Sequence, residues 1–307
     1  MSAFLNIAYI TARETPMIGW FFDSLHLQSG DDFTDLRVIV VDSNISAISK
    51  SSAISKSLDR NVIITPPKPT VWQGRHRLTK GEYWAKCNAA NTALCLAEDG
   101  WISFVDDLSV LDSNWLERVR SATARPMTCT LGSFKKVKNL TVEGGRILHL
   151  DEFAEGIDSR WNAGADNGPV PCGGDWMYGH VTAPVEAFLT VNGYPEALCD
   201  SLGFEDVLTG MAIQKAGYVF RYDRRMLIYE SEELHHTDVK RFKRFDKGVS
   251  PNDKSHAALA RVQAGDLSIW NHYDLRSLRE RILRGEPFPP PSGPTTDWYD
   301  GQPLSEL

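Results

Sequence analysis

The chain lacks long hydrophobic runs and has few cysteines. No stretch approaches the roughly eighteen consecutive apolar residues of a membrane-spanning helix, so none is expected. The five cysteines are scattered without a CxxC spacing, which argues against a disulfide framework or a zinc site and favours a reducing compartment. The apolar segment Phe4–Ile10 is too short and lacks the basic lead-in of a signal peptide. We therefore expect a soluble cytoplasmic protein with no membrane partner.

Glycine is also absent from the loop expected after the first strand, Thr11–Thr15. A glycine-rich phosphate-binding loop is usual at this place in nucleotidyltransferases, so its absence counts against that class. Acidic residues outnumber basic ones, giving a net charge of −7. Residues 214–285 reverse this balance with 15 Lys/Arg against 10 Asp/Glu. Such a basic segment is compatible with a polyanionic partner, although the charge alone favours a solvated helix face.

Apolar spacing predicts alternating strands and helices in the first third of the chain. Strands are expected at Leu5–Ile10, Leu36–Val41, Asn61–Thr65 and Trp101–Val105, and helices at Ile18–Leu27 and Tyr83–Leu96. Further on we expect helices at Asn114–Ala122, Ala183–Val191 and Asp206–Ala216, strands at Tyr218–Tyr222 and Met226–Tyr229, and a hairpin within 127–150. The alternation is typical of an α/β fold with a mixed, mostly parallel sheet flanked by helices.

The most informative segment is the predicted strand Trp101–Val105, which ends abruptly at Asp106 and Asp107. Ligands of open α/β sheets bind at the carboxyl ends of strands, where these carboxylates would lie. Carboxylate oxygens suit Mg²⁺ or Mn²⁺, which can bridge to nucleotide phosphates. Taken alone, the pair favours a simpler interpretation, the end of a strand and the start of a turn, because Asp is common in turns.

Four segments in this order resemble motifs of the GT-A fold of nucleotide-sugar glycosyltransferases, in particular family 2. They are the strand ends Thr11-Ala12-Arg13 and Val40-Val41-Asp42-Ser43, the helix start Tyr83–Asn91, the DxD-like Phe104-Val105-Asp106-Asp107, and the acidic Gly203–Gly210. The likeness covers about residues 3 to 237. It implies a metal-dependent, inverting hexosyltransferase that uses a nucleotide diphosphate sugar, UDP-sugar first of all, as donor.

The resemblance also implies roles for residues on the donor side. Thr11, Arg13 and Asp42 would hold the nucleobase and ribose, and Lys86 belongs to the family's Ala-Arg-Asn-like helix start. The usual second Asp of the DxD motif is Leu108 here, which cannot ligate a cation. We therefore prefer a register in which Asp107 binds the metal and Asp106 orients the ribose or the ion.

Further residues complete the implied site. His235 or His236 would be another metal ligand, an alternative to two ordinary surface histidines. Asp206 would be the general base and Glu205 would grip the acceptor or the donor sugar, with these roles open to exchange; both also suit the first turn of a helix. Gly174 and Asp175, in a segment expected to precede a helix, would line the donor sugar, with Trp176 offered for stacking or for the core.

The sequence leaves two classes of acceptor substrate as alternatives. A saccharide is the commonest acceptor in the family. However, Trp72-Gln73-Gly74, Trp84-Ala85-Lys86, Asp106–Leu111 and Asp297–Gly301 together resemble a phage subset that accompanies TET-type dioxygenases and glycosylates 5-hydroxymethylpyrimidines in DNA. The basic run Lys240–Arg244 and the arginines 276, 279 and 281 near two aromatic residues fit DNA, and the protein would then work in a phage-infected bacterial cell.

The resemblance divides the chain into a catalytic domain and an extension. Residues 1–238 would form the GT-A domain, with a nucleotide-binding half (1–111) and an acceptor half (112–238). Residues 239–307 would form a basic helical extension with a Pro-rich tail. Two other functions remain as alternatives, namely a nucleotidyltransferase and a non-catalytic module that binds sugar nucleotides or DNA.

Overall fold

The structure is a computed structural model of the 307-residue chain, and it describes residues 4–13, 15–29, 35–43, 61–70, 86–196, 205–235, 260, 264, 271 and 273–290. The elements in its first half are β1 (Leu5–Thr11), α1 (Ile18–Ser29), β2 (Leu36–Asp42), β3 (Val62–Thr65), α4 (Lys86–Leu96), β4 (Trp101–Val105), β5 (Ser109–Leu111), α5 (Trp115–Thr123) and β6 (Thr128–Glu143). The rest are β7 (Arg146–Ile157), η2 (Trp161–Ala163), β8 (Val170–Cys172), η3 (Gly174–Trp176), β9 (Val181–Pro184), α6 (Val185–Thr190), α7 (Glu205–Lys215), β10 (Val219–Ser231), α8 (Glu232–His235) and α10 (Leu275–Leu283).

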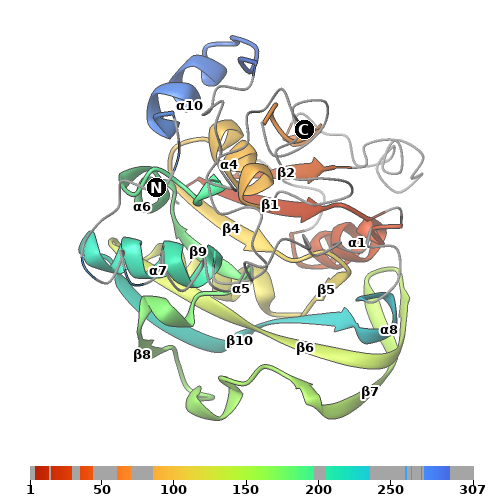
Figure 1. Ribbon diagram of the computed structural model, residues 1–307. Helices are drawn as coiled ribbons and strands as arrows, with labels where there is room; N and C mark the ends of the chain where they lie inside the picture. The colour runs from red at the N-terminus through yellow and green to blue at the C-terminus, as the bar shows by residue number, and fades with distance from the viewer. Residues whose placement is uncertain are drawn as a thin grey trace, which may run out of the picture.

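One mixed sheet runs through the molecule in the order β3-β2-β1-β4-β9-β6-β10-β5, with β7 paired to β6 and β8 to β10 (Figure 1). The first four strands in this order are parallel, so their carboxyl ends meet at one edge. Strand β9 is antiparallel to β4 and β6, whereas β6 and β10 are parallel to each other. This arrangement confirms the predicted α/β class with its sheet flanked by helices.

Two hydrophobic clusters cover the two faces of the sheet. All seven residues of β1 are buried because alternate side chains enter opposite clusters, Ile7 and Tyr9 one of them and Ala8 and Ile10 the other. Helices α4, α6, α7 and α10 contribute to the cluster of Ala8, and α1 and α5 to the cluster of Ile7. Helices α4 and α7, which begin with Lys86 and Glu205, therefore cover the same face of the sheet.

Most predicted elements lie where the sequence placed them, and two predictions were wrong in detail. The helix expected at Ala183–Val191 begins only at Val185, because residues 181–184 form strand β9 between β4 and β6. The two strands expected at Tyr218–Tyr222 and Met226–Tyr229 are one strand, β10, whose pairing with β6 shifts register between Tyr222 and Leu227.

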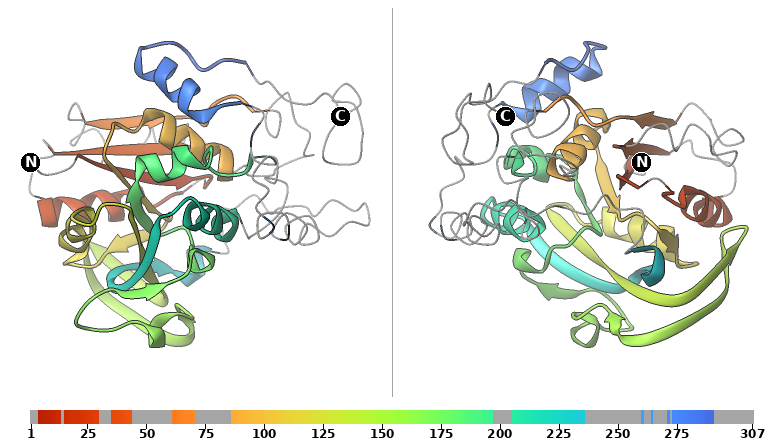
Figure 2. Two further views of the ribbon diagram at one scale, coloured as in Figure 1. Left: turned by 90° about the vertical axis from the view of Figure 1, so that its left-hand side faces the viewer. Right: turned by 45° about the vertical axis from the view of Figure 1, so that its right-hand side comes forward.

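Helix α10 packs into the main core although it lies near the end of the chain. Leu275 and Leu278 are buried in the same cluster as α4, and the helix lies beside α4 (Figure 2). Arg279 donates to the carbonyl of Ala97, at 2.7 Å from Nη2, and pairs with Asp99 at 2.8 Å. The residues around 271–283 are therefore part of the packing that supports α4.

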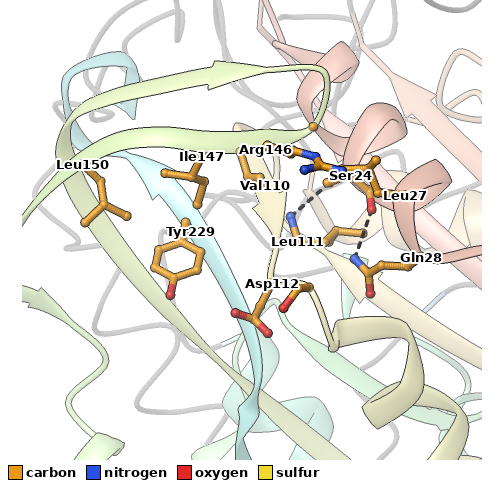
Figure 3. Close-up of a pocket in the computed structure, with 12 residues that line it drawn as sticks. Ser24, Leu27, Gln28, Val110, Leu111, Asp112, Arg146, Ile147, Leu150 and Tyr229 are labelled. Carbon is orange, nitrogen blue, oxygen red and sulfur yellow. Dashed lines mark hydrogen bonds between the residues drawn. The ribbon is translucent and has the colours of Figure 1, made fainter.

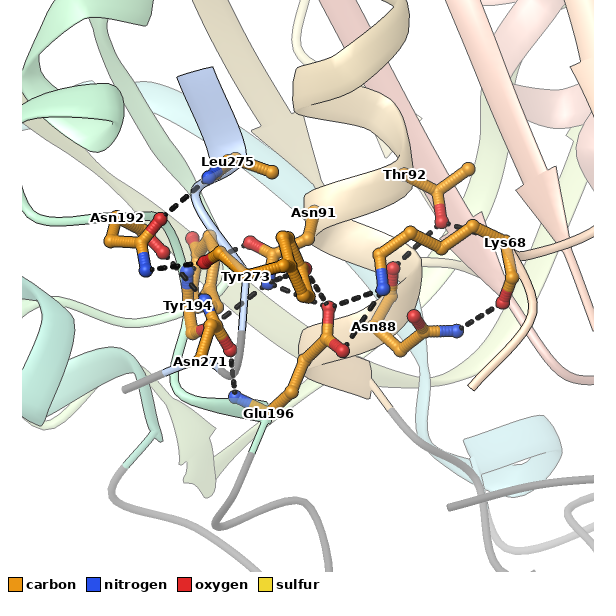
Figure 4. A network of polar contacts seen from close by, with 10 residues as sticks. All are labelled: Lys68, Asn88, Asn91, Thr92, Asn192, Tyr194, Glu196, Asn271, Tyr273 and Leu275. Atoms are coloured by element: carbon orange, nitrogen blue, oxygen red, sulfur yellow. Dashed lines mark hydrogen bonds and ion pairs between the residues drawn. The ribbon is translucent and has the colours of Figure 1, made fainter. Parts of the chain in front are cut away.

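A buried ion pair joins the segment after β3 to the segment after α6. The Lys68 ammonium lies 2.9 Å from Oε1 of Glu196, and both side chains are at most 7% exposed. Oε1 of Glu196 also accepts bonds from Asn91 of α4, at 2.8 Å, and from the Tyr273 hydroxyl (Figure 4). A charge pair removed from water needs such additional hydrogen bonds to be stable.

Amide side chains extend this network into the last described part of the chain. Asn271 accepts from the backbone N–H of Glu196 at 3.0 Å, and Asn192 accepts from that of Leu275 at 2.7 Å (Figure 4). We call the whole set the buried clasp; it comprises Lys68, Asn88, Asn91, Thr92, Asn192, Tyr194, Glu196, Asn271, Tyr273 and Leu275. The buried clasp fixes the chain just before residues 197–204, which lead into α7.

The long hairpin of β6 and β7 turns at Gly144 and Gly145, as the sequence predicted. A cavity of about 510 Å³ lies between this hairpin, α1 and β5, lined in part by Leu27, Arg146 and Tyr229 (Figure 3). Its wall includes Ser24, whose hydroxyl oxygen accepts from the N–H of Leu111 at 3.1 Å. Because α1 covers the face opposite to α4 and α7, this cavity is separate from the carboxylates described next.

Candidate active site

The carboxyl ends of β1 and β4 are joined by side chains around Asp107. Oδ2 of Asp107 accepts from the Thr11 hydroxyl at 2.9 Å and from Nε of Arg13 at 2.8 Å. Burial raises the pKa of Asp107, while the Arg13 guanidinium and the bond from Thr11 oppose that shift. Arg13 also donates to the carbonyl of Leu234 at 3.0 Å and so ties this edge to α8.

Asp42 joins the same edge from β2. The parallel register pairs it directly with Thr11, and both residues are fully buried. Three of the residues predicted for the nucleoside, Thr11, Arg13 and Asp42, are thus neighbours at the ends of two adjacent strands. Asp42 is about thirty positions away from Thr11 and Arg13 in the sequence, and the pairing of β1 with β2 brings the three residues together.

Asp106 faces the other way, toward the helices of the α4 side. A side chain at Gly179 would place its Cβ only 2.2 Å from Oδ1 of Asp106, so the glycine leaves room for this carboxylate. The negative charge of Asp106 contributes to raising the pKa values of Lys86, Asp206 and Glu230. Asp106 is therefore the carboxylate that faces the residues on α4, α7 and β10.

The amino termini of α4 and α7 meet at a second ion-pair cluster. The ammonium of Lys86 lies 3.1 Å from Oδ2 of Asp206 and 3.3 Å from Oε1 of Glu205. Within the part of the chain that the structure describes, the other oxygens, Oδ1 of Asp206 and Oε2 of Glu205, are buried and accept no hydrogen bond. Among the described residues, each carboxylate therefore has one oxygen that makes no hydrogen bond.

The charges in this cluster shift its pKa values strongly. Burial raises the pKa of Asp206 to about 7; Glu205 and Asp106 act in the same direction and Lys86 opposes them. Burial alone would lower the pKa of Lys86, but Asp206, Glu205 and Asp106 raise it well above its usual value. Lys86 is therefore a permanent cation, and Asp206 changes charge near neutral pH.

Glu230, near the end of β10, is a site residue that we did not predict. It is 4% exposed, and burial together with Asp106 raises its pKa to about 8, with Lys136 opposing the shift. A carboxylate directly after the apolar run of residues 226–229 is the signal that could have found it, because an acid is seldom buried in a strand unless it is paired or functional.

The acidic residues at this edge fit a divalent cation in their chemistry. The negative charge of Asp106 adds to the raised pKa of Asp107, and both aspartates add to that of Glu230, a repulsion that a bound cation would relieve. Among the described residues no three His, Cys, Asp or Glu side chains form a ready ligand set. Nε2 of the proposed ligand His235 lies 3.1 Å from the Lys136 ammonium, and His236 lies outside the described residues. A cation here would thus need further ligands, such as diphosphate oxygens.

The glycine-rich segment around Gly174 differs from its expected setting. It forms the short 3-10 helix η3 and is followed by strand β9, not by a helix. A Cβ on Gly174 would lie 2.2 Å from the carbonyl oxygen of Gly210, so the two glycines let η3 and α7 touch through their backbones. Asp175 is exposed, and the Trp176 ring lies edge-on to Tyr222 at 6.0 Å.

The arginines assigned to DNA phosphates are engaged within the protein. Arg276 pairs with Glu186 on α6, Arg279 with Asp99, and Arg281 with Glu286. Arg276 and Arg281 thus agree with the simpler alternative of helix-surface charges, whereas Arg279 is only 6% exposed and belongs to the packing of α10. The segments 72–77, 83–85, 203–204, 240–244 and 297–301, which carried other predicted features, lie outside the described residues.

Solved glycosyltransferases share this fold. The structure of the 1–349 fragment of S. aureus TarS with UDP-GlcNAc matches with a TM-score of 0.55 and 15% identity, over 91% of this chain and 70% of that one. GalNAc-T7 with UDP, GalNAc and Mn²⁺ matches with a TM-score of 0.53 and 11% identity, over 93% of this chain and 55% of that one. No protein-family model and no curated protein matches the sequence.

The similarity confirms the GT-A fold predicted from the sequence. Another TarS structure matches with a TM-score of 0.53 and 14% identity over 91% of this chain, which spans only 42% of that TarS chain. Identities this low establish a shared architecture and leave the reaction to be argued from the site. Within its described parts, the chain has no helix with the length and apolar character needed to cross a membrane.

Proposed function

We propose that the protein transfers a hexose from a nucleotide diphosphate sugar, most naturally a UDP-sugar, to an acceptor hydroxyl. The observation that carries the proposal is the oxygen Oδ1 of Asp206, which is buried and accepts no hydrogen bond from the described residues. Lys86 holds the opposite oxygen at 3.1 Å and so fixes the carboxylate in place. An oriented carboxylate with one available oxygen is what a general base requires.

The donor nucleoside would bind at the ends of β1 and β2. Thr11, Arg13 and Asp42 offer a hydroxyl, a guanidinium and a carboxylate at this edge, where ligands of α/β sheets bind. Asp42 would accept from the base, and the Asp106–Asp107 corner would face the ribose and the diphosphate. The structures of TarS with UDP-GlcNAc and of GalNAc-T7 with UDP support a nucleotide-sugar donor through the shared fold.

Charge that develops on the leaving diphosphate would be balanced at the Asp106–Asp107 edge. Asp107, Asp106 and one of the histidines 235 and 236 would hold a Mn²⁺ or Mg²⁺ ion together with the diphosphate. Glu230, whose pKa both aspartates raise, would add its negative charge to this site. When bound, such an ion acts as a Lewis acid for the departing phosphate oxygen. The Arg13 guanidinium beside Asp107 holds that carboxylate in position.

On the other side, Asp206 would take the proton of the acceptor hydroxyl as its oxygen attacks the anomeric carbon. Attack opposite the leaving group inverts the configuration at that carbon. Glu205, which shares Lys86 with Asp206, would hold the acceptor or the donor sugar through its available Oε2. Gly174 and the exposed Asp175 would border the donor sugar through η3, which packs on α7.

The acceptor classes are a saccharide and a 5-hydroxymethylpyrimidine in phage-type DNA. A nucleotidyltransferase and a non-catalytic binding module are the alternative functions.

A thermal-shift and calorimetric screen with UDP, UDP-sugars and GDP-sugars, with and without Mn²⁺, tests donor recognition. We expect UDP-sugars to bind wild-type protein. Binding should be lost in Asp42→Asn but kept in Asp166→Asn, which changes an 88% exposed carboxylate. Failure of every nucleotide to bind would contradict the proposal.

The pKa of Asp206 predicts how activity depends on pH. Below about pH 7 the carboxyl is protonated and cannot accept a proton, so kcat/KM should rise with pH and level off above that value. Because the Lys86 cation lowers this pKa, Lys86→Met should move the rising limb to higher pH. The measurement is kcat/KM from about pH 5.5 to 8.5 for both proteins. An unchanged midpoint in Lys86→Met would contradict the assignment.

A further inference from the structure

Tyr178 is an exposed aromatic side chain in an otherwise buried segment beside the candidate site. Its side chain is 47% exposed, whereas Met177 and His180 are at most 1% exposed. We propose that Tyr178 is the platform on which a sugar ring of a neutral saccharide acceptor stacks. The inference rests on the glycosyltransferase function proposed above and decides between its two acceptor classes.

The position of Tyr178 follows from the pairing of β9 with β4. Phe104 pairs with Val181 in this antiparallel register, so the residues before β9 continue alongside Asp106 and Asp107. The contact between Gly179 and Oδ1 of Asp106 confirms that the segment passes directly beside this carboxylate. Tyr178 directly precedes Gly179, and its ring lies 6.5 Å from that of Phe134 on β6. In our proposal this ring borders the bound acceptor.

Arg160 fixes the orientation of the Tyr178 ring. The guanidinium carbon lies 4.9 Å from the centroid of the Tyr178 ring and 4.8 Å from that of Tyr222, so the cation is held between two aromatic rings. Arg160 is itself 7% exposed and donates to Asp158, to the carbonyl of Trp176 at 2.6 Å and to that of Gly132 at 3.0 Å. An aromatic ring that is already ordered loses little conformational entropy when a ligand stacks on it.

The charges around Tyr178 favour an uncharged ligand. Arg160, which packs on the Tyr178 ring, pairs with Asp158. Two cations at the neighbouring Trp161 are also paired, Lys135 with Glu152 and Arg224 with Asp166. Lys135 and Arg224 both lie over the ring of Trp161, at 4.6 and 5.4 Å. Nucleic acid binds largely through cations that neutralise its phosphates, and these three described cations are already paired. The C–H face of a neutral sugar needs no such cation and packs on an aromatic face.

The test compares variants of Tyr178 in acceptor kinetics. Tyr178→Ala should raise the KM for a glycan acceptor about tenfold, in line with the value of one aromatic stacking contact, and leave the donor KM unchanged. Tyr178→Phe keeps the ring and should stay near wild type. Leu148→Ala, which removes a 61% exposed apolar side chain from β7, is the matched control and should leave the acceptor KM unaltered.

Each outcome separates this inference from the function on which it rests. Turnover with glycans and an unchanged acceptor KM in Tyr178→Ala would overturn the stacking role while the glycosyltransferase function stands. Turnover with hydroxymethylated DNA and not with glycans would overturn the neutral acceptor. Absence of donor turnover with every acceptor would overturn the function and this inference together. Donor binding by calorimetry verifies that each variant is folded.

Discussion

Asp206→Asn is expected to lower kcat by about 10²- to 10⁴-fold, the usual contribution of a general base. Asparagine keeps the size of the side chain and a polar contact to Lys86, which lies 3.1 Å from Oδ2 in the wild type. It removes the ability of Oδ1, the oxygen that accepts no bond from the described residues, to take a proton. The ground-state contacts at the ends of β1 and β2 are untouched, so donor affinity should change little.

The measurement is kcat with a saturating donor, together with the donor dissociation constant by calorimetry. Asp166→Asn is the matched control, since Asp166 is an 88% exposed carboxylate that pairs with Arg224. It should keep wild-type turnover. Full turnover in Asp206→Asn would show that another group is the base, with Glu205 the first candidate. A non-catalytic binding module would show neither turnover nor a difference between the two variants.

The second large effect is on stability, at the buried clasp. Glu196→Gln should lower the free energy of unfolding by about 3–5 kcal/mol, because it leaves the Lys68 ammonium buried without its counter-charge. The Lys68 and Glu196 side chains are 5% and 7% exposed, so water cannot replace the lost partner. Bonds from Asn91 and Tyr273 to the same carboxylate would also weaken.

Urea unfolding followed by circular dichroism measures this effect. Glu98→Gln removes one partner of a half-exposed pair, in which Glu98 is 49% exposed, and should cost less than about 1 kcal/mol. The double variant Lys68→Met/Glu196→Gln should recover part of the loss, because no buried charge is left unpaired. A Glu196→Gln protein as stable as Glu98→Gln would show that the clasp contributes nothing beyond a surface pair.

The fold was predictable because its signals are local. A strand that is buried on both faces must be apolar throughout, and β1, β2 and β4 were found by that rule. Strand β9 was misread because Val181–Pro184 is only four residues long and runs directly into α6. Helix α10 was not located from the sequence, since its burial depends on Leu275 and Leu278 meeting α4 across the fold.

The sequence predicted those residues of the candidate site that are acids at the end of a strand or the start of a helix. Asp106, Asp107, Glu205 and Asp206 stand at such places, and the structure adds that Lys86 connects the last two. Glu230 was missed although it directly follows the predicted strand Met226–Tyr229, because it belongs to none of the motifs that carried the resemblance. The exposure of Tyr178 could not be foreseen either, since it depends on Arg160, eighteen positions earlier in the chain, supporting its ring.

The central claim is transfer from a nucleotide-sugar donor at the carboxylates around Asp106 and Asp206. The most direct test is the release of nucleoside diphosphate by purified protein with UDP-sugars, Mn²⁺ and either simple glycans or hydroxymethylated DNA. We predict release that requires an acceptor, is greatest with a UDP-sugar and a glycan, and is lost in Asp206→Asn. No release with any pairing of donor and acceptor, or equal release by Asp206→Asn, would contradict the account.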